Sequence, residues 1–148
     1  MKVVEVNNRD PNLMSSLFEI WSMSVRATHD FLSRADFESI AGSVPGMLKS
    51  VPTLLVVLHR NGEPSSFAGI DGDSLEMLFV RPGDMGCGVG KRLVSDAITK
   101  YGVRRVSVNE QNIYAVGFYE YMGFQICSRQ ETDDQGRPYP ILRMEIRE

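Results

Sequence analysis

The sequence predicts an α/β domain whose mixed sheet is flanked by helices on both faces. Three observations predict this class. Segments with apolar residues at alternate positions are interleaved with segments that have the apolar spacing of helices. Turn signals containing Pro, Gly or Asn separate many of these segments. No internal repeat, low-complexity stretch or linker interrupts the 148 residues, so we expect one domain over residues 1–148.

The first half of the chain predicts a strand, two helices and the two strands of a hairpin, over residues 2–7, 11–25, about 35–46 or just beyond, 53–60 and 64–72. Asp10 is an N-cap residue, and Pro11 suits the first position of a helix. Apolar residues at helical spacing follow as far as Val25. The dipeptide Asn61-Gly62 is a strong hairpin signal.

The second half predicts a strand, a helix, a strand, a helix and two final strands, over residues 74–82, 89–101, 104–109, 112–122, 124–131 and 139–147. Gly102 ends the first of these helices, and Gly123 follows the second. The polar turn DDQGRP joins the last two strands. The order is therefore strand, two helices, three strands, helix, strand, helix and two strands.

The composition narrows the class of protein. A net charge of −3 argues against a nucleic-acid surface as the main partner, although a local basic patch is compatible with it. No apolar run approaches the ~20 residues of a membrane span, and the start lacks a signal-peptide core, so we expect a cytoplasmic protein. Two cysteines without a CxxC spacing, with only two histidines, predict neither a disulfide framework nor a metal site.

The stretch MGCGVG, residues 85–90, contains three glycines between a strand and a helix. The first N–H groups of a helix have no internal partners, and a glycine-rich approach opens them to an anion, for which a diphosphate is the expected type. Lys91 and Arg92 add positive charge in the first turn. The spacing is neither GxGxxG nor GxxxxGK[ST]. Taken alone, the stretch is equally compatible with a tight turn.

A second motif makes the interpretation specific. The segments LFVRPGDMGCGVGKRLV and VNEQNIYAVGFYEYMGF together resemble the GNAT superfamily of acetyl-CoA-dependent N-acetyltransferases. The family pattern N-x-x-A-x-x-[F/W]-Y-x-x-x-G-F is matched at all named positions from Asn112 to Phe124. In the pattern [Q/R]-x-x-G-x-[G/A], Gly88 and Gly90 match, but Met85 replaces the usual Gln or Arg and removes one side-chain contact to the diphosphate. The segments ATHDFLS and DDQGRPYPILRM also resemble a small bacterial subgroup of uncharacterised acetyltransferases.

The resemblance covers the whole chain and implies a mostly antiparallel central sheet, with acetyl-CoA as cosubstrate and no metal. It implies that the fourth and fifth strands splay apart and that pantetheine enters between them, with the fourth strand pairing with it. The implied cofactor-binding residues are Leu78, Phe79, Val80, Met85, Gly86, Cys87, Gly88, Val89, Gly90, Lys91, Arg92, Asn112 and Phe118. Each has a structural alternative: the phenylalanines suit a core, and Asn112 suits a helix N-cap.

Acetyl transfer to an amine by direct attack needs a base, an oxyanion donor and an acid for the leaving thiolate, with no covalent enzyme intermediate. Tyr119 is the candidate acid, and Tyr121, two positions later, is expected to point elsewhere. Glu76 is a candidate base because it lies four residues before Val80, which predicts that both share one face of the strand. It is equally compatible with an exposed strand carboxylate. Glu110 is a weaker candidate.

His29 follows the first helix, where this family builds the acceptor pocket. It is compatible with substrate binding, with general-base catalysis or with a loop hydrogen bond. Asp30, Phe31 and Tyr139 are further pocket candidates. The acceptor is expected to be a small-molecule amine or a peptide N-terminus, and the oligomeric state stays open, a homodimer included. A non-catalytic acyl-CoA sensor is the alternative function, whereas a dinucleotide-binding protein is disfavoured because no GxGxxG follows the first strand.

Overall fold

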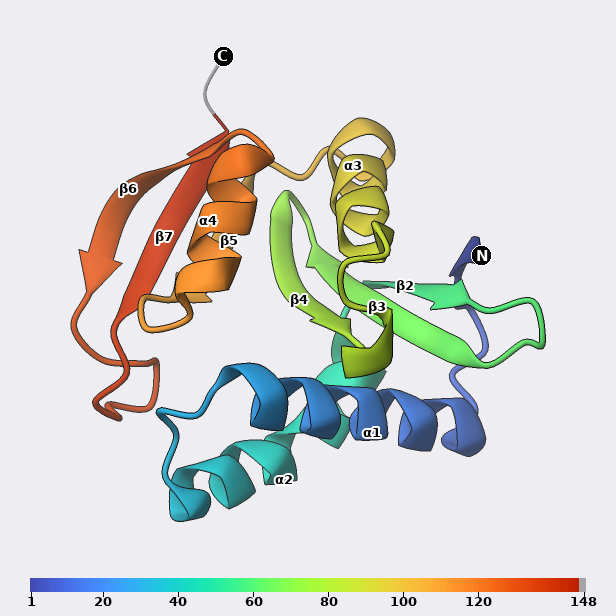
Figure 1. Ribbon diagram of the computed structural model, residues 1–148, viewed down its shortest axis with the longest axis horizontal. Helices are drawn as coiled ribbons and strands as arrows, with labels where there is room; N and C mark the ends of the chain where they lie inside the picture. The colour runs from blue at the N-terminus through green and yellow to red at the C-terminus, as the bar shows by residue number, and fades with distance from the viewer. Residues whose placement is uncertain (147–148) are drawn as a thin grey trace.

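The computed structural model describes residues 1–146 as one mixed seven-stranded sheet with helices on both faces (Figure 1). The strand order is β1-β2-β3-β4-β5-β7-β6. All neighbouring strands are antiparallel except β4 and β5. The strands are β1 Lys2–Glu5, β2 Thr53–Leu58, β3 Pro64–Asp71, β4 Ser74–Val80, β5 Arg105–Asn109, β6 Phe124–Gln130 and β7 Ile141–Ile146. The predicted fold class and element order are confirmed; Arg147, at the end of the predicted last strand, lies outside the described residues.

The helices are α1 Pro11–Thr28, α2 Arg34–Ser50, α3 Val89–Tyr101 and α4 Ile113–Tyr121, with one 3-10 turn, η1 Pro82–Asp84. The Asp10 side chain accepts a hydrogen bond from the Leu13 N–H, which satisfies one of the free donors at the start of α1. Gly102, in a left-handed conformation with φ of 71°, ends α3 as the sequence predicts.

Helix α2 is longer than the sequence predicts. It continues through Gly42, Pro45 and Gly46 to Ser50. Pro45 removes one backbone donor and disfavours a helix interior. Val44 and Leu48 are nevertheless buried on the face that packs toward the sheet. Tertiary burial therefore outweighs local propensity in this helix.

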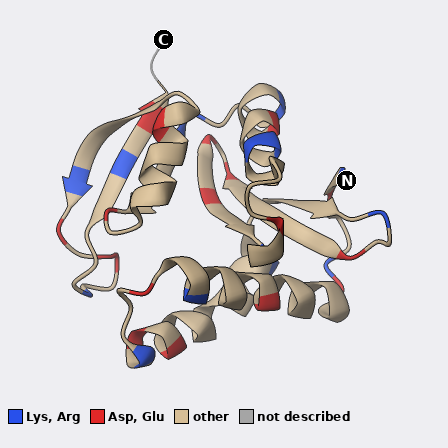
Figure 2. Cartoon of the chain, viewed as in Figure 1, with Lys and Arg blue, Asp and Glu red and all other residues tan. Residues whose placement is uncertain are grey.

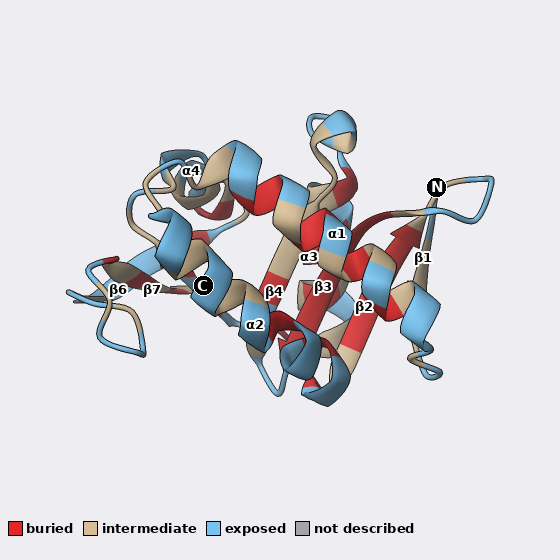
Figure 3. Ribbon diagram, turned by 90° about the horizontal axis from the view of Figure 1, so that it is seen from below, coloured by how far each residue is buried: buried red, intermediate tan, exposed pale blue. Residues whose placement is uncertain are grey.

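Two apolar cores lie on opposite faces of the sheet. Helices α1 and α2 cover one face, where Leu17 and Ile20 are fully buried against residues of β2, β3 and β4. Helices α3 and α4 cover the other face, where Leu93 and Val94 are fully buried. Figure 3 shows the buried stripe of α1 and the buried strands β2 and β3 behind it. This double coverage buries β2 and β3 along most of their length; β2 is nearly all apolar, whereas β3 also buries Ser65 and Ser66.

The sheet opens between β4 and β5. These parallel strands pair only at Ser74 with Arg105 and at Leu75 with Val106. Beyond Leu75 the edge of β4 that faces β5 has no partner strand among residues 1–146, and the two strands diverge in Figure 1. Unpaired backbone N–H and C=O groups therefore remain along this edge of β4.

A β-bulge in β4 sets the orientation of its side chains. Gly69 pairs with Met77, whereas the next residue of β3, Ile70, pairs with Leu75, so Glu76 is the extra residue. As a result Leu75 packs in the core beside α3, but Met77 packs in the core beside α1. The bulge breaks the alternation from which we expected Glu76 to share a face with Val80, and that part of the prediction is wrong.

Acidic and basic side chains are interspersed over helices and strands (Figure 2). No helix among the described residues is long and apolar enough to cross a membrane.

Candidate active site

The largest apolar-lined space near the predicted motifs is a cavity of about 490 Å³ between β4 and α4, which we call the long cavity. The glycine stretch and the end of α1 complete its walls. The lining residues are Ser24, Thr28, His29, Leu78, Phe79, Val80, Asp84, Met85, Gly86, Gly88, Val89, Gly90, Lys91, Asn112, Tyr114, Ala115, Phe118, Tyr119 and Tyr121. The cavity thus brings together the two sequence motifs, which lie about twenty residues apart.

The glycine stretch presents backbone N–H groups to the long cavity. Gly86 and Gly88 have φ of 83° and 84°, a region that glycine adopts far more readily than other residues. Gly88 is the N-cap of α3 and has no side chain to bond the first turn, so the N–H groups of that turn stay available. A Cβ built on either glycine has no protein atom within 4 Å. The site can therefore receive an anion at the positive end of α3.

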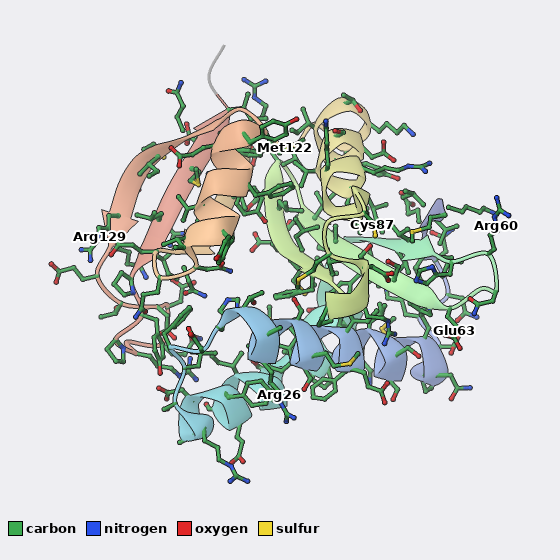
Figure 4. The ribbon with its side chains drawn as sticks, viewed as in Figure 1. Arg26, Arg60, Glu63, Cys87, Met122 and Arg129 are labelled. Atoms are coloured by element: carbon green, nitrogen blue, oxygen red, sulfur yellow. The ribbon has the colours of Figure 1, made fainter. Side chains whose placement is uncertain are left out.

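Eleven of the thirteen predicted cofactor-binding residues border the long cavity; Cys87 and Arg92 do not. Cys87 is exposed on the loop before α3 (Figure 4). The Arg92 guanidinium donates a hydrogen bond of 3.2 Å to the Met1 carbonyl. The positive side chain that faces the cavity is therefore Lys91. Met85, at the family's Gln or Arg position, borders the cavity without a charge.

Asn112 has a structural role and keeps a free group. Its side-chain oxygen accepts a 3.2 Å hydrogen bond from the Ala115 N–H and caps α4. Within residues 1–146 its amide nitrogen has no hydrogen-bond partner, and it remains a donor at the cavity wall. Phe118 packs over the start of α3, where its Cζ lies 3.8 Å from a Cβ built on Gly90. For Asn112 and Phe118, the structural role and the cofactor-binding role that the sequence left open therefore do not exclude each other.

Tyr119 is buried, with 7% of its surface exposed, and borders the long cavity. Its ring lies edge-on to Phe124 at 5.7 Å. Within the described chain its hydroxyl has no hydrogen-bond partner. Burial raises the pKa of Tyr119 well above its ordinary value, so the hydroxyl stays protonated at neutral pH. The hydroxyl is therefore an accessible donor at the cavity wall without a protein partner among residues 1–146.

Two smaller cavities adjoin the long one. The gap cavity, about 210 Å³, lies where β4 and β5 separate and is bordered by Leu75, Val106, Asn109 and Tyr119 among others. The inner cavity, about 180 Å³, lies between the sheet and helices α1 and α2. His29 and Phe79 border all three cavities, so the long and inner cavities meet at these two side chains.

The inner cavity is mainly apolar and has two carboxylates. Its apolar wall consists of Trp21, Val25, Leu32, Ile40, Val44, Met47, Met77, Phe79 and Tyr139. The Asp133 carboxylate accepts hydrogen bonds from the Arg137 guanidinium and from the N–H groups of Gln135 and Arg137. Glu76 is exposed, as one of the two alternatives expected, and it has no hydrogen bond or ion pair within residues 1–146. The bulge therefore leaves one unpaired carboxylate at the junction of the inner and gap cavities.

His29 is the C-cap of α1, where its N–H donates to the Val25 carbonyl at 2.7 Å. Its Nδ1 lies 2.7 Å from the Thr28 hydroxyl oxygen. Burial lowers the pKa of His29 below its ordinary value of 6.5, and the neighbouring Asp30 partly opposes this change. The imidazole is therefore neutral at pH 7 and can accept a proton at a place that all three cavities reach.

The other predicted acceptor-pocket residues lie around His29 in different ways. Asp30 is exposed and borders a separate outer cleft. Phe31 packs between His29 and Tyr139, with ring centroids 5.1 and 6.0 Å away, and does not border the inner cavity. Tyr139 does border it, but its hydroxyl bonds the Asp36 carboxylate and the Ser33 N–H. Its hydroxyl thus joins the loop before β7 to the N-terminal turn of α2.

Two further expectations change with the structure. Tyr121 was expected to point elsewhere, yet it borders the long cavity with 71% of its surface exposed, and its hydroxyl accepts a 3.2 Å hydrogen bond from Lys91. Glu110 forms an ion pair with Arg129, on the outer strand β6 in Figure 4. The wall residues Thr28, Asp84, Asn109 and Asp133 lie within the segments that carry the family resemblance, but none of them was a candidate site residue.

Comparison with known proteins gives a consistent family. Residues 29–147 match the model of the acetyltransferase (GNAT) domain. The chain is 42% identical over 128 residues to the peptidyl-lysine N-acetyltransferase YjaB of Salmonella typhimurium, covering 86% of this chain and 88% of that protein. The solution structure of apo-form YjaB from Escherichia coli superposes with a TM-score of 0.88 at 37% identity, covering 98% of this chain and 97% of that one. The crystal structure of the PaiA N-acetyltransferase from Thermoplasma acidophilum in complex with coenzyme A superposes with a TM-score of 0.70 at 19% identity. The match covers 98% of this chain and 99% of that one, and at this identity it supports the fold alone.

Proposed function

Because the chain belongs to the GNAT family of acetyltransferases, we propose that it transfers the acetyl group of acetyl-CoA to the ε-amino group of a lysine side chain. The observation that carries this proposal is the meeting of the long and inner cavities at His29 and Phe79. The long cavity suits an elongated anionic ligand. The inner cavity suits an apolar side chain that ends in a positive charge. The relatives named as peptidyl-lysine N-acetyltransferases support the choice of acceptor.

The long cavity has groups suited to the diphosphate and to the pantetheine arm of coenzyme A. The free N–H groups at the start of α3, together with Lys91, would hold the diphosphate. The unpaired edge of β4 around Leu78, Phe79 and Val80 would pair with the amides of pantetheine as an added strand. Bound acetyl-CoA supplies an acetyl group activated as a thioester.

The inner cavity fits a lysine side chain better than a whole small molecule. Ligand pockets for drug-sized molecules span roughly 300–1,000 Å³, whereas this cavity is about 180 Å³. Its apolar wall would cover the methylene stem of lysine. The unpaired Glu76 carboxylate would bind the ammonium group, since a charge that leaves water needs an opposite charge.

Two residues at the junction of the cavities, His29 and Tyr119, would carry out the proton transfers. Neutral His29 takes the proton from the amine that Glu76 holds, because an amine of pKa near 10 keeps its proton at neutral pH without a base. The backbone N–H groups along the open edge of β4 are available to stabilise the oxyanion. The Tyr119 hydroxyl, which stays protonated, gives a proton to the departing sulfur. The tyrosine oxygen then regains a proton from the nitrogen, which loses its second hydrogen as the amide forms.

The proposal is tested with matched peptides and acetyl-CoA. One peptide has a blocked N-terminus and a single lysine; the second has a free N-terminus and arginine in place of lysine; an aminoglycoside is the third acceptor. We expect CoA release and acetylation of the ε-nitrogen, measured by mass spectrometry, with the first peptide alone. Turnover with the free N-terminus or the aminoglycoside in place of lysine would refute the choice of acceptor. Binding of acetyl-CoA without turnover on any amine would favour the alternative function, an acyl-CoA sensor.

A further inference from the structure

The last turn of α1 contains a short chain of hydrogen bonds that ends at His29. The Thr28 Oγ1 lies 2.8 Å from the Ser24 carbonyl oxygen and 2.7 Å from His29 Nδ1. All three residues border the long cavity. The two hydrogen bonds therefore connect the helix backbone, through the Thr28 hydroxyl, to the imidazole at the junction of the cavities.

The two contacts of the Thr28 hydroxyl are both hydrogen bonds in only one tautomer of the imidazole. A carbonyl oxygen only accepts, so the single hydroxyl hydrogen of Thr28 is donated to Ser24. The hydroxyl then has only lone pairs to offer to His29, and Nδ1 must carry the hydrogen of the second bond. In the neutral ring the other nitrogen, Nε2, is then left with its lone pair.

We infer that Thr28 is a positioning residue that holds His29 in the Nδ1–H tautomer, with Nε2 free to accept the proton of the acceptor amine. A base oriented by a third group is a recurring arrangement in enzymes, and the bond at one imidazole nitrogen decides which nitrogen is basic. The catalytic part of this inference rests on the proposed function. The tautomer itself does not, and it is measured separately below.

The surroundings of His29 hold the ring in place. The backbone N–H of His29 donates to the Val25 carbonyl, and the imidazole ring packs against Phe31. Other charged and titratable groups border the three cavities or the outer cleft. Around the outer cleft these are Arg26, Asp30, Arg34 and Glu38. Around the three cavities they are Glu76, Asp84, Lys91, Tyr114, Tyr119, Tyr121, Asp133 and Tyr139. Within residues 1–146 the bond to Thr28 is the one side-chain hydrogen bond of the His29 imidazole.

Helix α3 contains a matched control. The Thr99 Oγ1 also lies 2.8 Å from the carbonyl oxygen four residues earlier, that of Ser95. No imidazole follows it. A threonine that only satisfies a helix carbonyl should respond like Thr99, whereas Thr28 should respond differently if it positions His29.

The activity test compares Thr28→Val, Thr28→Ser and Thr99→Val with acetyl-CoA and the blocked lysine peptide. Thr28→Val should lower kcat by roughly two- to tenfold, the factor that corresponds to one hydrogen bond, with little change in the Kd for CoA. Thr28→Ser keeps the hydroxyl and should restore kcat, and Thr99→Val should match the wild type. Equal kcat in Thr28→Val and Thr99→Val would overturn the positioning role while leaving the proposed function intact.

The tautomer test uses nitrogen NMR of the imidazole rings, which needs no substrate. The chain has two histidines, so His59→Gln identifies the signals of His29. At pH 7.5 we expect a protonated Nδ1 and an unprotonated Nε2 in the wild type and in Thr28→Ser, and a mixture of tautomers in Thr28→Val. A protonated Nε2 in the neutral wild-type ring, or no change in Thr28→Val, would overturn the inference whatever the acceptor amine proves to be.

Discussion

Adding one methyl group at Gly88 should separate cofactor binding from folding. Gly88 is the N-cap of α3 with φ of 84°, borders the long cavity, and has no protein atom within 4 Å of a built Cβ. Gly102 ends the same helix with φ of 71° and equally open surroundings, but it does not border the long cavity. The pair Gly88→Ala and Gly102→Ala therefore changes the same property at the two ends of one helix.

The expected magnitudes follow from the conformations. A left-handed conformation costs a non-glycine residue roughly 1–2 kcal/mol, with no further cost for a clash at either site. At about 3 °C per kcal/mol for a chain of this size, each variant should lose roughly 3–6 °C in Tm without ligand. CoA at 100 times its Kd should stabilise the wild type by about 2.7 kcal/mol, or roughly 8 °C.

The two variants should differ only when CoA is added. The Gly88→Ala methyl occupies space at the N–H groups proposed to bind the diphosphate. If it weakens binding tenfold, the stabilisation at the same CoA concentration falls to about 1.4 kcal/mol, or roughly 4 °C. Gly102→Ala should keep the full wild-type shift. Differential scanning fluorimetry with a CoA titration measures both effects, and an unchanged CoA-induced shift in Gly88→Ala would refute the placement of the diphosphate.

Three further predictions concern the junction residues. Tyr119→Phe should lower kcat about 10²-fold with little change in the Kd for acetyl-CoA. Tyr101→Phe, at the end of α3 and outside the three cavities, should have wild-type rates, and equal kcat in both variants would exclude Tyr119 as the acid. Because burial lowers the pKa of His29, kcat/KM should decline only below pH 6.5. The free energy of unfolding should also decrease below pH 6.5, since the unfolded chain then binds a proton that the folded chain does not. If kcat/KM declines in the same way in His29→Gln, the titrating group is not His29. Glu76→Gln should raise KM for the lysine peptide at least tenfold and leave the Kd for CoA unchanged, with Glu63→Gln at the hairpin tip (Figure 4) as control; an unchanged KM would remove Glu76 from ammonium binding.

The element order was predictable because it depends on local signals. Asp10, Asn61-Gly62 and Gly102 each mark a cap or a turn through their own chemistry, and the structure has each where the sequence predicts it. The glycine stretch alone was compatible both with a tight turn and with an anion site, and the structure gives Gly88 a positive φ that glycine adopts far more readily than other residues.

The geometry of the candidate site was less predictable because it depends on pairing between distant segments. Strict alternation along β4 assigned Glu76 to a face, but the register against β3 inserts it as a bulge residue. Tyr139 has the aromatic character of a pocket residue, yet Asp36, about one hundred positions away, engages its hydroxyl. Tyr121 differs from its expected direction because α4 turns it toward Lys91 at the cavity mouth. No local pattern in the sequence encodes these contacts.

The central claim is that the cofactor cavity and the lysine cavity meet at His29 and Phe79. A conjugate that joins the sulfur of CoA through an acetyl bridge to the lysine nitrogen of the blocked peptide occupies both cavities at once. Its Kd, measured by isothermal titration calorimetry, should be at least tenfold lower than that of CoA, about 1.4 kcal/mol, because the second binding event becomes intramolecular. A Kd equal to that of CoA alone, with the lysine peptide contributing nothing, would contradict the account.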